Sequence, residues 1–472
     1  MPRDLLLVSF AALALSTSSA SGEHHWPQFR GPRASGIGSG HPPTHWDVTT
    51  GEHVAWKTAI AGLGHSAPIV WGDRVYLTTA VNAEAEHPEV ATGWSGGSGE
   101  SAVDTGSWTW QVWCLHLNTG RVLWKRDAHS GKPQIQRHLK ASHANCTPVT
   151  NGKFIVAFFG SEGLYCYDRE GQLVWQRDLG KLHSGPYDAV ELEWGFASSP
   201  ILHEDRVIVQ CDCLNVHFVA VLDLRTGKEI LRIPRPGEVA TWSTPTVIST
   251  GKRRQIVCNG FHNMAGYDLD TGSRLWHLSG GGDVPVPTPL FANGLIYITN
   301  GHGRSPTFAI HPHATGDLTP LALAPLPSES PQPPPETQPT DDANPPQPQD
   351  SPALAWWQAR DGAYMPTPLI KDKLLYTCND NGRLTVRNAL NGDLIYRQRI
   401  GKGGRNYSAS AVAAGGHVFF VSERGEVTVI KEGRQFEEVA VNHLDEIVMA
   451  TPAIAGDRLL IRGVRHLYCL AP

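Results

Sequence analysis

The sequence has no excess of basic residues, and this excludes one class of partner. Its 40 Lys and Arg residues are outnumbered by 45 Asp and Glu residues, which gives a formal net charge of −5 at pH 7. Proteins that bind nucleic acid carry a basic patch or stripe, because contacts to phosphate supply much of their affinity. We therefore expect no nucleic-acid partner.

Cysteine motifs that hold zinc or haem are missing as well. None of the eight cysteines stands in a CxxC or CxxCH motif, so zinc ribbons and c-type haem attachment have no support. The closest pair is Cys211 and Cys213 in VQCDCLN, and no two cysteines are adjacent. Because a chain of this length needs no disulfide staples, we expect most cysteines to be buried free thiols.

Long apolar runs are missing except for one near the start. Arg3 precedes an apolar run from Leu5 to Leu15, and small residues follow as far as Ala20. This order is typical of a cleaved secretory signal, and the run is too short to span a bilayer as a helix. We expect residues 1–20 to be a signal peptide. The protein is then periplasmic or secreted, without a membrane span or a lipid anchor.

Helical periodicity is nearly absent, and a β-rich repeat fills the chain instead. A Ser or Thr, a Pro and then alternating β-formers recur, as in NCTPVTNGKFIVAFF and MPTPLIKDKLLYTC. Most successive copies are 41 to 52 residues apart. The anchor residues of the eight copies are Pro68, Pro148, Pro200, Pro245, Pro289, Pro368, Ala411 and Pro452.

Each copy contains two hairpins, so the repeat predicts one fold. Four short antiparallel strands at this spacing are typical of a propeller blade. Eight anchors therefore predict an all-β, eight-bladed propeller over residues 53–472, after an N-terminal extension at 21–52. The last copy ends at Pro472 after three strands, and His53–Ile60 reads as an outer strand without a blade. We expect these two segments to pair, because unpaired sheet edges are a liability.

The second hairpin of most copies has a recurring turn and a recurring aromatic residue. Turns such as LNTG, LRTG and LDTG are followed four residues after the glycine by Trp124, Trp175, Leu231, Trp276 or Tyr396. An aromatic residue at a fixed place on the outer strand suits packing between neighbouring blades.

The segments LHLNTGRVLW, LDLRTGKEIL and YDLDTGSRLW resemble the PQQ-repeat (quinoprotein-like) β-propellers. The resemblance covers nearly all of the chain after about residue 50, and WPQFRGPRASGIG is similar to the start of exported, uncharacterised bacterial members. It implies the fold more strongly than a function. The family includes PQQ-dependent alcohol dehydrogenases, a subunit of the outer-membrane β-barrel assembly machinery and many proteins of unknown role.

For a dehydrogenase, the resemblance implies a planar tricarboxylate cofactor, PQQ, with Ca²⁺ and a catalytic Asp. It also implies two adjacent, disulfide-bonded cysteines against which PQQ stacks. This chain has Cys211-Asp212-Cys213 in their place, and we find no carboxylate cluster to assign to Ca²⁺. We therefore assign no cofactor and keep PQQ with Ca²⁺ as the alternative.

Strand alternation predicts which loops share a face. Loops from strand two to strand three, and from one blade to the next, lie together on what we call the top face. The loops between strands one and two, and between three and four, lie on the bottom face. The insertion Val81–Gln111 is then expected on the top face. The Pro-rich, acidic insertion Thr319–Ser351 is expected on the bottom face as a disordered or polyproline-like loop.

Residues that approach the innermost strands from the top face form the predicted binding pocket. Aromatic side chains, an Arg and several His near a channel mouth suit a planar or anionic ligand. The alternative is that the tryptophans plug the channel and that Arg405 is a structural cation. No HxH or HxxxH spacing unites these histidines into a metal site. The candidates are His143, Trp194, Trp242, Arg405 and Tyr407, with His65, Asn145, Glu193 and Tyr364 beside them.

Two functional hypotheses follow from these observations. The first is an exported, non-catalytic, monomeric propeller that binds a small molecule, a glycan or an envelope protein. The second is a PQQ-dependent oxidoreductase that acts on an alcohol or a sugar. Because the adjacent cysteines and the cofactor ligands are not found, we favour the first. A third hypothesis, hydrolase or lyase chemistry by Glu193 and His143, has no identifiable nucleophile or acid–base pair.

Overall fold

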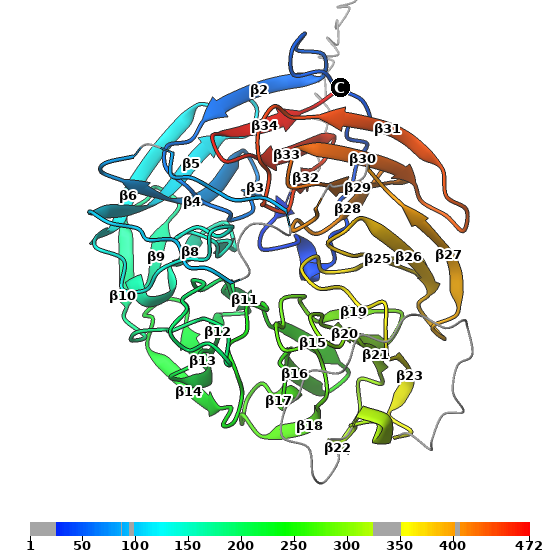
Figure 1. Ribbon diagram of the computed structural model, residues 1–472. Coiled ribbons are helices and arrows are strands. Elements are labelled where there is room, and N and C mark those ends of the chain that lie inside the picture. The colour runs from blue at the N-terminus through cyan, green and yellow to red at the C-terminus, as the bar shows by residue number, and fades with distance from the viewer. Residues whose placement is uncertain (1–24, 86, 94–98, 324–350, 402–405) are drawn as a thin grey trace, which may run out of the picture.

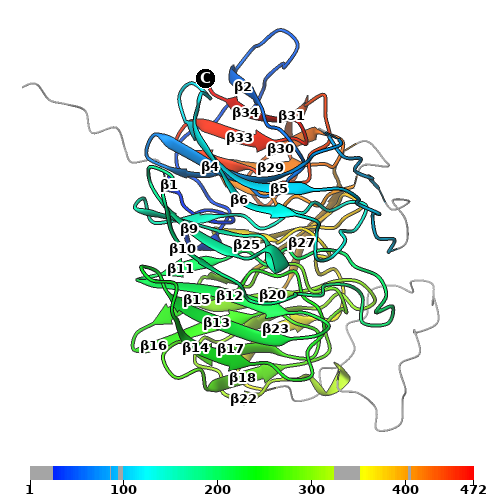
Figure 2. The same cartoon turned by 90° about the vertical axis from the view of Figure 1, so that its left-hand side faces the viewer.

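The structure, a computed structural model, describes residues 25–85, 87–93, 99–323, 351–401 and 406–472. Eight antiparallel sheets form a ring around a central axis, which confirms the eight-bladed propeller (Figure 1). Figure 2 shows the same ring turned toward its edge. The described helices are three short 3-10 turns, η1 (Pro32–Ala34), η2 (Gly160–Glu162) and η3 (Leu321–Leu323). No helix in these ranges is long and apolar enough to cross a membrane.

Each blade has four strands, numbered from the axis outward (Figure 1). The first strands are β3 (Ile69–Trp71), β7 (Val149–Thr150), β11 (Ile201–His203), β15 (Thr246–Thr250), β19 (Leu290–Ala292), β24 (Leu369–Lys371), β28 (Val412–Ala414) and β32 (Ala453–Ala455). The second strands are β4 (Arg74–Asn82), β8 (Phe154–Phe158), β12 (Arg206–Asp212), β16 (Arg253–Cys258), β20 (Leu295–Thr299), β25 (Leu374–Cys378), β29 (His417–Val421) and β33 (Arg458–Arg462).

The outer half of each blade is built in the same way. The third strands are β5 (Trp108–His116), β9 (Leu164–Asp168), β13 (His217–Asp223), β17 (Met264–Asp268), β21 (Thr307–Ile310), β26 (Arg383–Asn388), β30 (Glu426–Lys431) and β34 (His466–Leu470). The fourth strands are β6 (Val122–Gly131), β10 (Leu173–Arg177), β14 (Glu229–Pro234), β18 (Arg274–Leu278), β23 (Leu354–Gln358), β27 (Leu394–Arg399), β31 (Glu438–His443) and β2 (Val54–Ala59).

The Ser/Thr-Pro repeat joins neighbouring blades near the axis. Each first strand begins directly after its anchor residue, as Ile201 does after Pro200. The hydroxyl before the anchor accepts a hydrogen bond from the preceding blade, so the motif both starts a strand and links two blades. The bonds are Ala67 N to Thr147 Oγ1, Thr147 N to Ser199 Oγ, Ser199 N to Thr244 Oγ1, Thr288 N to Thr367 Oγ1, Thr367 N to Ser410 Oγ and Ser410 N to Thr451 Oγ1, at 2.9 to 3.0 Å.

The Thr-Gly turn and the outer-strand tryptophan form a second link between blades. The indole of Trp175 donates from Nε1 to the Leu224 carbonyl of the next blade at 2.8 Å. A Cβ at Gly227 in that blade would lie 2.6 Å from the same indole. Only a residue without a side chain fits under the ring, which explains why glycine recurs. Trp56, Trp124 and Trp356 make the equivalent bond, which confirms the predicted packing between blades.

The core follows the two-residue period of the strands. In β8, Ile155 packs toward the blade before it, whereas Val156 and Phe158 pack toward the blade after it. Successive side chains of a strand point to opposite faces of its sheet. Each blade is therefore apolar on both faces, and the core is a series of layers between blades.

The last blade contains a strand from the other end of the chain. Strand β2 pairs antiparallel with β34, with Trp56 opposite Cys469 and Ala59 opposite His466. The sheet order is β2-β34-β33-β32. Residues 54–59 thus form the outer strand of the blade that ends at Pro472.

The N-terminal segment from residue 25 packs inside the ring rather than beside it (Figure 1). Strand β1 (His25–Trp26) pairs with β3 on the inner side of the first blade. Arg30 is fully buried and donates to the carbonyls of Pro368 at 2.8 Å and of Ala411 at 3.2 Å. The residues that the sequence suggested as an extension therefore cross-link blades that are far apart in the chain.

The two insertions differ from their predicted extents. Strand β4 continues to Asn82 and β5 begins at Trp108, so both ends of the predicted insertion 81–111 are strand. The predicted bottom-face position is wrong for the first residues of the insertion 319–351. Strand β22 (Gly316–Asp317) runs parallel to β18 as a fifth strand, and Leu323 then accepts from Arg304 of a top-face loop at 3.2 Å. The segment 324–350 lies outside the described residues.

Candidate functional site

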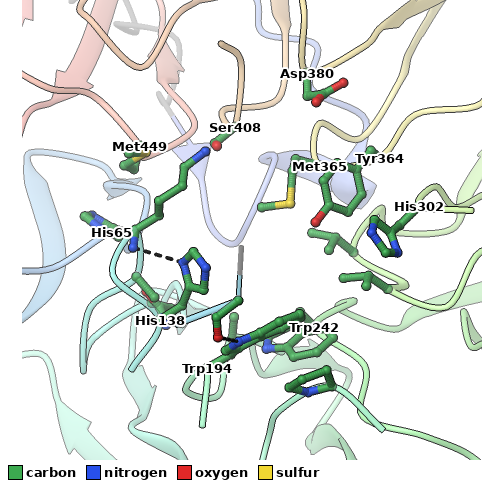
Figure 3. Close-up of a pocket in the computed structure, with 18 of the residues that line it drawn as sticks. His65, His138, Trp194, Trp242, His302, Tyr364, Met365, Asp380, Ser408 and Met449 are labelled. Atoms are coloured by element: carbon green, nitrogen blue, oxygen red, sulfur yellow. Dashed lines mark hydrogen bonds between the residues drawn. The ribbon is translucent and has the colours of Figure 1, made fainter. Parts of the chain in front are cut away.

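A cavity of about 570 Å³ lies at the top-face end of the channel. Its lining comes mainly from the loops that alternation predicted, namely connections between blades and loops from strand two to strand three. Phe29 of the N-terminal segment also lines the cavity, with several hydroxyls that precede the first strands. Figure 3 shows ten labelled lining residues that belong to most of the blades.

Two tryptophans on adjacent blade connections form an aromatic surface in the cavity, which we call the indole pair (Trp194 and Trp242). Their ring centroids are 5.5 Å apart with an interplanar angle of 35°. Trp194 donates from Nε1 to the Gly99 carbonyl at 2.6 Å, and Trp242 donates to the Gly195 carbonyl at 2.8 Å. Because both indole N–H groups are bonded to backbone, the rings are held in place with π surface toward the cavity (Figure 3).

Three aspartates from different blades form an acidic wall (Asp188, Asp283 and Asp380). Asp283 lies 2.6 Å from Nδ1 of His302, and this hydrogen bond raises the pKa of His302. Burial, together with Asp380 and Asp283, raises the pKa of Tyr364 to about 12. Figure 3 shows Tyr364 and His302 close together, with Asp380 on the same half of the cavity.

An ion pair joins the connection between the first two blades to the seventh blade. Lys140 Nζ lies 2.6 Å from Oε1 of Glu423, whose side chain is 2% exposed. Glu423 also accepts from Ser408 Oγ at 2.6 Å and from Gly93 N at 2.7 Å. The insertion and two blade connections are therefore tied together at one buried carboxylate.

The two histidines near this ion pair are neutral at pH 7. The pKa of His65 falls to about 3 because of burial and the nearby Arg462 and Arg137. Burial, Lys140 and Arg137 lower the pKa of His138 to about 4. Within the described ranges, no group of three or more His, Cys, Asp or Glu side chains is arranged to hold a metal ion.

The structure brings only some of the predicted site residues together. Trp194 and Trp242 line the cavity, as do His65, Asn145 and Tyr364. Arg405 lies outside the described residues. His143, Glu193 and Tyr407 do not line the cavity.

Those three side chains are used to hold loops and core in place. His143 Nε2 lies 2.8 Å from Asp104, which also binds Arg137, and burial lowers the pKa of His143. Glu193 accepts from Gln136 N at 2.6 Å. Tyr407 is 1% exposed within the core between the sixth and seventh blades. His143 and Tyr407 are not among the described lining residues, because the side-chain direction at a blade start depends on a register that the sequence does not show.

The carboxylates of the cavity were not predicted from the sequence. Asp380 and Glu423 follow second strands in short loops that read as ordinary turns, NDNG and SERG. Asp188 and Asp283 lie in blade connections. The alternation rule that placed the tryptophans would also have placed these four residues.

All eight cysteines are buried and free, as expected. Cys211 and Cys213 belong to the core between the second and third blades. Neither lines the cavity. They therefore do not offer a disulfide surface on which a planar cofactor stacks.

The described lining does not fit PQQ. Three carboxylates of the cofactor would meet Asp188, Asp283, Asp380 and Glu423 in the same cavity. Lys140 is the one Lys or Arg among the described lining residues, and Glu423 already neutralises it. Bringing like charges together in a partly buried site is unfavourable.

Comparisons with known proteins agree with the fold. Residues 109–331 match the family model described as outer membrane protein assembly factor BamB. A europium-containing methanol dehydrogenase superposes with a TM-score of 0.62 and 10% identity, covering 94% of this chain and 90% of that chain. The quinohemoprotein alcohol dehydrogenase from Comamonas testosteroni gives a TM-score of 0.60 and 13% identity over 95% and 80% of the two chains.

A third structure, BamB from Moraxella catarrhalis, gives a TM-score of 0.49 and 12% identity over 83% of this chain and 96% of that chain. A search of curated proteins finds no match. Identities this low show the shared fold alone. The repeat, the eight blades and the family match, which covers residues 109–331, are consistent with the PQQ-repeat β-propellers.

Proposed function

We propose that this protein is an exported, non-catalytic propeller that binds a ligand at the top-face end of its channel. The observation that carries the proposal is the cavity itself. Its volume, about 570 Å³, is within the range of small-molecule sites. It has a fixed aromatic surface in the indole pair and polar groups that converge from several blades.

The charge of the cavity supports binding over PQQ-dependent oxidation. The described lining is dominated by carboxylates, and the buried cysteines are in the core between blades. We therefore derive no reaction step through PQQ. The similarity to the two dehydrogenase structures supports the fold and leaves the oxidoreductase as the alternative to be tested.

Export and an envelope setting are part of the same proposal. The first 20 residues have the order of a secretory signal. The matching family model is described as an outer membrane assembly factor. A ligand of such a protein is a small molecule, a glycan or a segment of an envelope protein, and we propose that the propeller acts as a monomer.

The test combines a binding assay with a turnover assay. Ligand panels are titrated while the total tryptophan fluorescence is followed, with Trp242→Leu as the variant that removes half of the indole pair. Dye-linked oxidation of alcohols and sugars is measured in parallel after incubation with PQQ and Ca²⁺. We expect saturable quenching that Trp242→Leu weakens, and no dye reduction above a boiled control. Substrate-dependent dye reduction that Trp242→Leu abolishes would show that the protein is an enzyme.

A further inference from the structure

The described lining of the cavity is mainly acidic, whereas the sequence suggested a planar or anionic ligand. That suggestion rested on aromatic side chains, Arg405 and several histidines near the channel mouth. In the structure, the described part of the lining contains the acidic wall and Glu423, with Lys140 as its only Lys or Arg. The chemistry of the ligand must therefore be inferred again from the side chains that are present.

One lysine of the described lining acts on the acidic wall. Burial raises the pKa of Asp380, and Lys140 partly offsets this effect. Lys140 is paired with Glu423 at 2.6 Å and is held there by the buried carboxylate. The histidines on that side, His65 and His138, are neutral at pH 7 because their pKa values are lowered to about 3 and about 4. Within the described lining, His302, bonded to Asp283, is a second basic group against the wall.

Neighbouring tyrosines show the negative potential of this half of the cavity. Burial is the larger cause of the raised pKa of Tyr187, and Asp283 and Asp188 raise it further. The pKa of Tyr364 is likewise raised by burial first and then by Asp380 and Asp283. Carboxylates from three separate blade loops thus act on one space.

The aromatic side chains add a second attraction for a cation. The face of an indole or phenol ring carries negative potential, and an ammonium group close above it is stabilised. Trp242 and Tyr364 lie on the connections before the fourth and sixth blades, and both line the cavity with the acidic wall. Since the N–H groups of Trp194 and Trp242 are already bonded to backbone, these two indoles offer a ring face to a ligand and not a hydrogen-bond donor.

We propose that the half of the cavity formed by the acidic wall, Trp242 and Tyr364 binds an organic ammonium ion. The wall supplies charge from several sides, and the rings cover the methylene groups that flank the ammonium. This inference rests on the proposed binding function and specifies the chemical class of the ligand. The top-face cavity then selects alkylamines over neutral and anionic compounds of the same size.

The experiment uses probes that differ only in charge. Spermidine and cadaverine are titrated into the purified protein by calorimetry, with the pentanediol that matches cadaverine in length as the neutral control. We expect one-to-one binding of the amines, at least tenfold weaker binding of the diol, and weaker amine binding when NaCl is raised from about 50 to about 500 mM. All three results are expected if the positive charge of the amine supplies most of the affinity.

Two substitutions locate the site. Asp380→Asn keeps the shape of the side chain and removes one charge of the wall, so cadaverine should bind about fivefold to tenfold more weakly. The matched control is Asp372→Asn, an 82% exposed aspartate at the bottom-face turn of the same blade, which should leave the affinity unchanged. Trp242→Phe should retain more of the affinity than Trp242→Leu, because phenylalanine still presents a ring face.

The possible outcomes separate the inference from the proposed function. Equal affinity for the diol and cadaverine would overturn the ammonium inference and leave a neutral-ligand binding protein. No binding of either amine at about 10 mM, or equal effects of Asp380→Asn and Asp372→Asn, would also overturn it. Saturable binding of PQQ in the same cavity would overturn both the inference and the proposed function.

Discussion

A glycine substitution tests the link between the Thr-Gly turn and the tryptophan of the preceding blade. Gly227 has φ +65°, and a Cβ placed there would lie 2.6 Å from Cδ2 and Cε3 of Trp175. Alanine in this left-handed conformation costs about 1 to 2 kcal/mol on its own. The added methyl also displaces the indole, whose N–H bonds the Leu224 carbonyl at 2.8 Å. Loss of that buried bond costs about 1 to 3 kcal/mol more.

The chain contains a matched control for the cost of placing alanine in the left-handed backbone conformation. Gly251 has φ +60° and no atom within 4 Å of the position of a Cβ. Gly251→Ala should therefore lower the free energy of unfolding by about 1 to 2 kcal/mol, and Gly227→Ala by about 2 to 5 kcal/mol.

The assay is urea unfolding followed by tryptophan fluorescence, with the m-value checked for each variant. Trp175→Leu, alone and combined with Gly227→Ala, completes a double-mutant cycle. The account requires the two substitutions to couple, because Trp175→Leu removes the indole and leaves space for the methyl group. Equal losses for the two glycine variants, or additivity of Gly227→Ala with Trp175→Leu, would refute the reasoning.

Three further predictions concern stability. Arg30→Met leaves the carbonyls that Arg30 binds, including those of Pro368 and Ala411, without their donor; urea unfolding should show a loss of at least about 2 kcal/mol, whereas the exposed Arg33→Met should show little. Asp361→Asn leaves Arg383, Arg387 and Arg397 facing one another without a carboxylate, so the melting temperature should fall at low salt and recover in high salt; Asp205→Asn, which breaks one exposed pair with Arg225, should have little effect at either salt concentration. The pKa of His302 is raised by its bond to Asp283, so its contribution to stability is fully present below the ordinary value of 6.5 and is lost as pH rises through the raised pKa; His302→Asn should flatten that part of the pH–stability curve, and an unchanged curve would contradict the assignment.

The blades could be predicted from the sequence because one short motif has two structural roles. The residue before each anchor, such as Ser199 or Thr451, links two blades through its hydroxyl, and the anchor itself starts a strand. A motif with two such roles is repeated at every blade, so its spacing reveals the ring. Turn glycines could be predicted for the same reason, since Gly120, Gly171, Gly227 and Gly392 each lie under an indole where no side chain fits.

The N-terminal segment could not be predicted in the same way. Arg30 binds carbonyls of the sixth and seventh blades, more than 300 residues away in the chain. Its partners are backbone atoms, which have no signature in the sequence. Ring closure alone brings them to the axis, where Arg30 meets them.

The position of the candidate site could be predicted from the sequence better than the chemistry of its side chains. Alternation of strands placed Trp194 and Trp242 at the top-face end of the channel, where they line the cavity. The carboxylates were not predicted because Asp380 and Glu423 stand in short turns whose polar residues look ordinary in isolation. These carboxylates become a feature of the site only when the ring brings several loops to one axis.

The central claim is that this eight-bladed propeller has a binding cavity that does not accept PQQ. Calorimetric titration of the purified protein with PQQ, with and without Ca²⁺, tests it most directly, with thermal unfolding as the check that the protein is folded. We predict no saturable heat in either condition, while cadaverine gives a one-to-one isotherm. Saturable one-to-one binding of PQQ that strengthens with Ca²⁺ would contradict the claim and identify the protein as a quinoprotein.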